Sequence, residues 1–218
     1  MIEETVQPIL NELKAGNCFH EEVTLVAATK TRTASEINRA IQAGVTDIGE
    51  NRVQEFTAKY DEVHGARRHF IGRLQTNKVK YLIGKTFLIH SVDRKELADT
   101  ISRLSQKAGI VTDILLEVNL GEESKGGYPL SEVFSAYEAL RNTEGICIRG
   151  FMAMLPLGAS DTQAGQLCDN MRALFDKARA QDTNIRYLSM GMSSDWKLCL
   201  AHGANMIRLG TSIFGERN

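Results

Sequence analysis

Two short segments near the end of the chain combine glycine with hydroxyl side chains, residue types that bind small anions. Residues 189–195 read SMGMSSD and lead into a helix expected near Trp196, while residues 209–215 read LGTSIFG and follow the last apolar run. Free backbone amides and hydroxyls at such positions favour a phosphate. A single loop of this kind is also an ordinary turn before a capped helix. Two such loops on adjacent strands predict a phosphate site formed by the two segments together.

Lys30 is the residue best suited to covalent chemistry, because it directly follows the apolar run of residues 23–28. We expect apolar neighbours to desolvate its ammonium partly, which lowers the pKa of a lysine and frees the amine to attack a carbonyl. The alternative is a lysine that reaches water at the end of a strand. A reactive amine beside a phosphate site points to pyridoxal 5'-phosphate (PLP), or to a phosphorylated aldehyde or ketone substrate as in an aldolase.

Arg208 helps to separate these chemistries. It alternates with Met206 in the last apolar run, so both side chains lie on one face of a strand. From that face Arg208 could donate to a pyridine nitrogen. An arginine cannot accept the ring proton, so the ring would be a weak electron sink. The alternative for Arg208 is an ion pair with a neighbouring carboxylate.

Other chemistry has weaker support in the sequence. Glu117 and Asn119 share a strand face and either line the same site or pair within a core. The five histidines form no HxH or HxxxH pair, so no metal site is expected. The four cysteines form no CxxC pair, which favours reduced thiols in the cytosol over a disulfide framework.

The elements that must position these residues alternate between strand and helix. Eight apolar, β-rich runs begin near residues 23, 46, 69, 87, 114, 146, 185 and 206, with helical spacing in several of the segments between them. Thr33 and Glu36 form a capping box, and Gly44 stands where that helix would end. We predict a single α/β domain over residues 1–218, a (β/α)8 TIM barrel with an N-terminal helical segment, residues 1–20, packed on it. The alternative is an open doubly wound sheet.

A closed barrel would bring the first strand beside the last, and so Lys30 beside the phosphate loops. Such barrels carry their active sites at the carboxyl ends of the strands, where all these residues fall. A chain of 218 residues is near the lower limit for this fold, so we expect no second domain.

Charge and hydropathy exclude several classes of partner. The formal net charge is −1, which argues against nucleic acid or an acidic membrane as the partner. The N-terminus lacks the positive charge of a signal peptide, and no apolar run approaches the roughly 18 residues of a membrane span. A cytoplasmic protein is expected. One stretch, residues 64–85, holds six basic residues and no acid, and is either a solvated face or a docking surface.

Several segments, in order along nearly the whole chain, resemble those of the PLP homeostasis proteins. They are ATKT at residues 28–31, GEN and VQE within 49–55, HFIG, LQ and NK within 69–78, IHSVD at 89–93, GEESKGG at 121–127, LSMGMS at 188–193, and RLGT with IFG within 208–215. The resemblance implies a single barrel similar to the N-terminal domain of bacterial alanine racemase. Arg73 stands where histidine is common, and Arg32 stands where a lysine is usual.

The resemblance also implies roles for individual residues. Lys30 would carry the cofactor as a Schiff base, with Asn51 at the cofactor and Met192 beside it. Ser193, Gly210 and Thr211 would hold the phosphate, and Arg208 would face the pyridine nitrogen. Lys125 matches a lysine of the ligand-handling loop, without a defined role.

The function implied is intracellular PLP homeostasis, in which the protein buffers the cofactor and delivers it to PLP-dependent apo-enzymes without turnover. The alternative is a PLP-dependent amino-acid racemase. Racemisation needs a base on each face of the cofactor adduct, and no tyrosine directly follows an expected strand. We therefore expect a binding protein, as a monomer, rather than an enzyme.

Overall fold

The computed structural model describes residues 2–122 and 125–216. Its strands lie in the order β4-β3-β2-β1-β9-β8-β7-β5-β6, all pairings are parallel, and a further β4–β5 pairing closes a barrel of eight strands. The eight are β1 (Thr24–Ala28), β2 (Asp47–Glu50), β3 (Arg67–Phe70), β4 (Leu88–Val92), β5 (Thr112–Asn119), β7 (Ile146–Ala153), β8 (Tyr187–Ser189) and β9 (Met206–Leu209). The predicted barrel is confirmed, and the open sheet is wrong. The short β6 (Tyr128–Pro129), which pairs with the end of β5, was not predicted.

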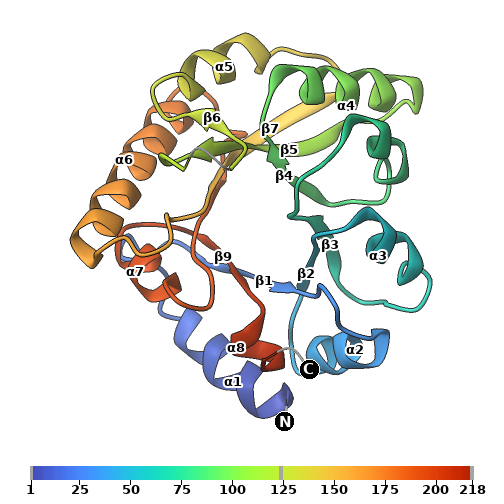
Figure 1. Cartoon of the computed structure of the whole chain (residues 1–218), viewed down its shortest axis with the longest axis vertical. Coiled ribbons are helices and arrows are strands. Elements are labelled where there is room, and N and C mark those ends of the chain that lie inside the picture. Colours follow the sequence, from blue (N-terminus) through green and yellow to red (C-terminus); the bar gives the residue numbers. More distant parts are fainter. Residues whose placement is uncertain (1, 123–124, 217–218) are drawn as a thin grey trace.

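The helices form a ring outside the barrel (Figure 1). They are α1 (Ile2–Leu13), α2 (Ala34–Gln42), α3 (Val53–Ala58), the 3₁₀ helix η1 (Thr76–Tyr81), α4 (Lys95–Lys107), α5 (Val133–Leu140), α6 (Asp161–Arg179), α7 (Trp196–Ala201) and α8 (Thr211–Phe214). The expected capping box at Thr33 and Glu36 is present. Gly44 follows α2 with φ +108°, a left-handed conformation that favours glycine.

Apolar side chains pack in two layers. The larger layer lies between the strands and the helices, and the smaller one fills part of the barrel interior with Val26, Leu88, Leu115, Met152 and Met206. This smaller layer leaves room inside the barrel for buried polar side chains, which are described below. Their burial requires hydrogen-bond partners, because an unpaired polar group in the interior is costly.

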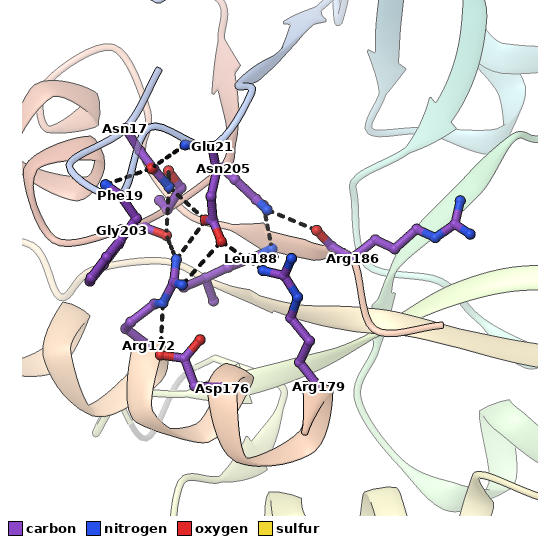
Figure 2. A network of polar contacts seen from close by, with 11 residues as sticks. Asn17, Phe19, Glu21, Arg172, Asp176, Arg179, Arg186, Leu188, Gly203 and Asn205 are labelled. Carbon is purple, nitrogen blue, oxygen red and sulfur yellow. Dashed lines mark hydrogen bonds and ion pairs between the residues drawn. The ribbon is translucent and has the colours of Figure 1, made fainter. Parts of the chain in front are cut away.

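The N-terminal segment is held to the barrel by both its helix and the chain that follows. Within α1, the Thr5 hydroxyl donates to the carbonyl of Ile213 in α8 at 2.7 Å. After α1 the chain runs through turns to β1, and the Glu21 carboxylate accepts from Arg172 and Arg179 of α6, each at 2.6 Å (Figure 2). These contacts fix the approach to β1, and therefore the position of Lys30 just beyond it.

Candidate functional site

The residues predicted from sequence gather on one sector of the barrel mouth. Lys30 follows β1 and Asn51 follows β2, while Ser193 follows β8 and Gly210 follows β9. These four strands are consecutive neighbours in the order β2-β1-β9-β8. The register pairs Ala27 with Leu209, so the segments that carry Lys30 and Gly210 leave the barrel side by side.

The two glycine- and hydroxyl-rich loops meet at Ser193. Its Oγ accepts from the backbone N–H of Gly210 at 3.4 Å and from that of Ser212 at 3.3 Å. Thr211 is exposed beside them. Two amides that converge on one hydroxyl oxygen form a donor set that suits the oxygens of a phosphate. Met192 leads into Ser193 and is oriented by its own N–H, which donates to Asp195 at 2.7 Å.

The turn that presents Lys30, which is half-buried, has a strained backbone. Thr31 has φ +65°, a left-handed conformation that is unfavourable for a β-branched residue. Two hydrogen bonds hold the turn in this shape: Thr31 N–H donates to the Glu55 carboxylate at 2.7 Å, and Arg32 N–H donates to the carbonyl of Thr29 at 3.1 Å. Such strain persists only where the surroundings impose it, and it is common at ligand sites.

A partly buried ion pair lies against the same turn. The Lys59 ammonium donates to the Thr29 carbonyl at 3.1 Å, to Glu50 at 2.8 Å and to Glu55 at 3.2 Å. Burial raises the pKa of Glu50, although Lys59 and Thr29 stabilise its charged form. Lys59 was not predicted from the sequence, in which its i,i+4 spacing from Glu55 is the local signal. This ion pair therefore fixes the backbone on both sides of Lys30.

Arg208 is buried inside the barrel, on the interior face that it shares with Met206. Its guanidinium donates to the Ser189 carbonyl and hydroxyl at 2.8 and 2.7 Å, and to the Ala153 carbonyl at 3.1 Å. These partners are neutral oxygens, not the carboxylate of the alternative interpretation. A guanidinium has five N–H donors, and these three bonds leave two for a ligand. Burial lowers the pKa of Arg208.

A chain of polar contacts continues from Arg208 through the barrel to its opposite end. Ser189 Oγ lies 3.2 Å from His90 Nδ1, His90 Nε2 lies 2.9 Å from His69 Nδ1, and His69 Nε2 lies 2.8 Å from Asp47 Oδ1. Burial lowers the pKa of both histidines, so both rings are neutral at pH 7.

Neutral rings permit only one direction of donation in this chain. Arg208 donates to Ser189, whose hydroxyl donates to His90. His90 Nε2–H donates to His69, and His69 Nε2–H donates to Asp47. We call this chain the interior relay. It orients the hydroxyl that faces Arg208, and neither histidine was singled out from the sequence.

Two further polar groups line the mouth without a complete set of partners. Burial, together with the nearby Asp93, raises the pKa of Glu117 to about 7. Asn51 Oδ1 is buried and has no hydrogen-bond partner among the described residues. An acceptor left without a protein partner fits a ligand that supplies a donor. A Cβ on Gly72 would lie 2.1 Å from the carbonyl oxygen of Asn51, so only glycine allows this approach.

Lys125 lies in the loop after β5, where its ammonium pairs with Glu122 at 2.9 Å. The Asn119 side chain donates to the carbonyls of both residues and so orders this loop. Residues 123 and 124 of the GEESKGG segment lie outside the described residues. Lys125 therefore lies on the β5 side of the mouth, away from the sector formed by β8, β9, β1 and β2.

Comparison with known proteins identifies the family. The chain is 41% identical over 197 residues to the pyridoxal phosphate homeostasis protein of Aquifex aeolicus, covering 88% of this chain and 86% of that one. It belongs to the pyridoxal phosphate homeostasis protein family. The model of the alanine racemase N-terminal domain matches residues 13–218, in keeping with the wider group of barrels to which this family belongs. The homeostasis protein of Escherichia coli strain K12 is 33% identical over 204 residues, 91% of this chain and 87% of that one.

Solved structures agree with this family assignment. PipY of Synechococcus elongatus, in a structure with PLP bound, superposes with a TM-score of 0.88 at 33% identity, over 99% of this chain and 100% of that one. The alanine racemase of Clostridium difficile superposes with a TM-score of 0.79 at 15% identity, over 98% of this chain and 57% of that one. The racemase therefore shows only that the homeostasis family shares its barrel fold.

Residues 2–122 and 125–216 include all the helices named above. None of the helices there has both the length and the apolar character that a membrane span requires. That part of the chain also brings together no group of three or more His, Cys, Asp or Glu side chains able to hold a metal ion.

Proposed function

We propose that this protein binds PLP and serves intracellular PLP homeostasis. The observation that supports the proposal is the position of Lys30 in a chain that belongs to this family. This lysine lies on a strained turn after β1, beside the two glycine- and hydroxyl-rich loops that follow β8 and β9. PLP, when bound, supplies an aldehyde that reacts with amines and a phosphate that anchors it. The residues present suit both groups, and the unpartnered Asn51 Oδ1 adds an acceptor for a ligand donor.

Each residue has a defined part in this proposal. Lys30 supplies the amine that holds the aldehyde carbon, and the Thr29–Arg32 turn keeps that amine in place. Ser193, Gly210 and Thr211 bind the phosphate through hydroxyl and amide donors. Arg208 directs a free N–H toward the ring nitrogen, and Met192 packs beside the ring.

We propose a carrier and not a racemase. The supporting argument is chemical: a buried arginine offers the ring nitrogen donors only, and cannot take its proton. A ring nitrogen without a proton withdraws electrons weakly, which disfavours reactions that need a stabilised carbanion. The names of the relatives also describe homeostasis and not turnover.

The cellular setting belongs to the same proposal. We propose a cytoplasmic monomer, a single domain over residues 1–218, that delivers PLP to PLP-dependent apo-enzymes. The four cysteines are free thiols, a state that suits a reducing compartment. Neither nucleic acid nor a membrane is a partner in this proposal.

The visible spectrum of the purified protein tests the cofactor assignment. We expect a yellow protein whose chromophore is trapped on the chain by borohydride, and complete loss of the trapped adduct in Lys30→Ala. Lys107→Ala, at an exposed position at the end of α4, is the matched control and should trap normally. A protein that cannot be reconstituted with PLP, or trapping that survives Lys30→Ala, would refute the assignment.

A second experiment separates carrier from racemase. The reconstituted protein is incubated with L-alanine in heavy water, and exchange of the α-proton is followed by NMR. A carrier leaves the α-proton in place over many hours. Exchange at the rate of an enzyme, abolished by Lys30→Ala, would overturn the carrier proposal.

A further inference from the structure

A large basic cavity lies at the barrel mouth beside the proposed cofactor site. Its volume is about 1020 Å³, near the upper end of the roughly 300–1,000 Å³ typical of small-molecule sites. Three segments line it: residues 51–55 after β2, residues 73–78 after β3, and Arg94 after β4. The strands β2, β3 and β4 are neighbours in the barrel (Figure 1). The cavity therefore continues the mouth from Asn51 away from β1 and β9.

The lining of this cavity carries an excess of positive charge. It contains four cationic side chains and one carboxylate: Arg52, Arg73, Lys78, Arg94 and Glu55. The Glu55 carboxylate is already bound by Thr31 N–H at 2.7 Å and by the Lys59 ammonium at 3.2 Å. Its single negative charge faces both Lys59 and Arg52, so it does not offset the four cations and the cavity keeps a net positive charge.

Among the described residues, three of the four cations form no ion pair. Arg94 pairs with Asp93. Within residues 2–122 and 125–216, the side chains of Arg52, Arg73 and Lys78 form no hydrogen bond or ion pair. Like charges around one concave space repel one another, and a bound anion relieves that repulsion. The carboxamides of Gln75 and Asn77 lie on the same wall and add polar contacts.

The basic stretch of residues 64–85 does not form one surface: Arg73 and Lys78 line this cavity, whereas Lys80 and Lys85 are exposed outside it. Arg67, at the start of β3, pairs with Asp47 at 2.8 Å. Arg68 donates to the carbonyls of Tyr60 and Val63. Both arginines therefore have structural partners, whereas Arg73 lies beyond the other end of β3, at the mouth.

We propose that this basic cavity binds a small molecule that carries at least two anionic groups, beside the site assigned to PLP. A concave site enclosed by three segments suits a small ligand better than the flat face of a protein partner. Guanidinium and amide donors together recognise phosphate or carboxylate oxygens. The proposal does not depend on PLP, since none of the three free cations belongs to the phosphate loops after β8 and β9.

Calorimetric titration with inorganic pyrophosphate tests the proposal. The apo-protein is used at constant ionic strength without divalent cations, and the wild type is expected to bind. Arg52→Gln/Arg73→Gln should weaken binding about tenfold or more, since a hydrogen bond to a charged group contributes at least about 1.4 kcal/mol, or tenfold. The matched control, Arg103→Gln/Lys107→Gln, makes the same charge change at exposed positions of α4 and should stay within twofold.

A second variant distinguishes the basic cavity from the phosphate loops. If pyrophosphate bound at the phosphate loops and not in the cavity, Ser193→Ala/Thr211→Val would lose affinity while Arg52→Gln/Arg73→Gln would not, and that result would overturn the proposal. Absence of binding by the wild type, an equal loss in the control, or no loss in the cavity variant would overturn it as well. So would tighter binding of an acidic peptide than of pyrophosphate. Failure of the PLP assignment is distinguished from these outcomes by the visible spectrum, in which the protein incubated with PLP would then show no bound chromophore.

Discussion

The interior relay makes a quantitative prediction about pH and stability. His90 is completely buried, and its burial, with the neighbouring His69 and Arg208, lowers its pKa well below 6.5. In the unfolded chain the same ring binds a proton near pH 6.5. The unfolded state therefore binds the extra proton below that pH. The contribution of the neutral, buried His90 to the free energy of unfolding is therefore fully present above pH 6.5 and decreases as the pH falls.

The magnitude follows from proton linkage. One proton bound only in the unfolded state changes the free energy of unfolding by about 1.4 kcal/mol per pH unit. Between pH 7.5 and pH 5.5, integration across the unfolded pKa gives a loss of about 1.4 kcal/mol for His90. His90→Gln removes the titrating ring and leaves an amide donor toward His69 Nδ1. The stability difference between wild type and His90→Gln should therefore shrink by about 1.4 kcal/mol over this interval.

Urea unfolding of the two apo-proteins at pH 7.5, 6.5 and 5.5 measures this difference. A group outside the relay with a shifted pKa, such as Glu117, titrates in both proteins, and its contribution cancels. His64→Gln, which replaces an exposed histidine outside the relay, is the control for the loss of an imidazole. A constant difference for His90→Gln would refute the argument, because it would mean that the native ring accepts a proton as readily as the unfolded chain.

Two further substitutions test how local backbone features support the site and the fold. Gly72→Ala introduces a Cβ 2.1 Å from the Asn51 carbonyl oxygen, so the backbone at Asn51 must move. We expect the PLP affinity to fall about tenfold, which is the effect of losing one good hydrogen bond. Unchanged affinity in a spectroscopic titration would show that Asn51 is not at the cofactor. Thr33→Ala removes the N-terminal cap of α2 and should lower the free energy of unfolding by about 1 kcal/mol, with no change in PLP affinity. Urea unfolding measures this loss, and an unchanged free energy of unfolding would contradict a stabilising role for the cap.

Local patterns predicted much of the mouth correctly. Apolar runs marked the eight barrel strands, because fully buried parallel strands read as short continuous apolar segments. The capping box at Thr33 predicted a helix start that the structure confirms. The two glycine- and hydroxyl-rich loops were visible as sequence, and neighbouring strands bring them together at Ser193.

Other features depended on strand order and register. The β4–β5 pairing closes the barrel. Asp47, His69 and His90 lie on β2, β3 and β4, separated by 22 and 21 residues, so no local motif connects them. The basic stretch looked continuous, yet β3 sends Arg67 and Arg73 to opposite ends of the barrel.

The alternation of strand and helix, the family, the candidate amine and the phosphate loops could all be predicted from residue types within a few positions of one another. The hold of Glu50, Glu55 and Lys59 on the Lys30 turn, the relay from Arg208 to Asp47 and the gathering of four cations around one cavity appear only once the chain is folded. The reason is physical. Burial and the distance between charges set these properties, and both depend on how the strands pair around the closed barrel.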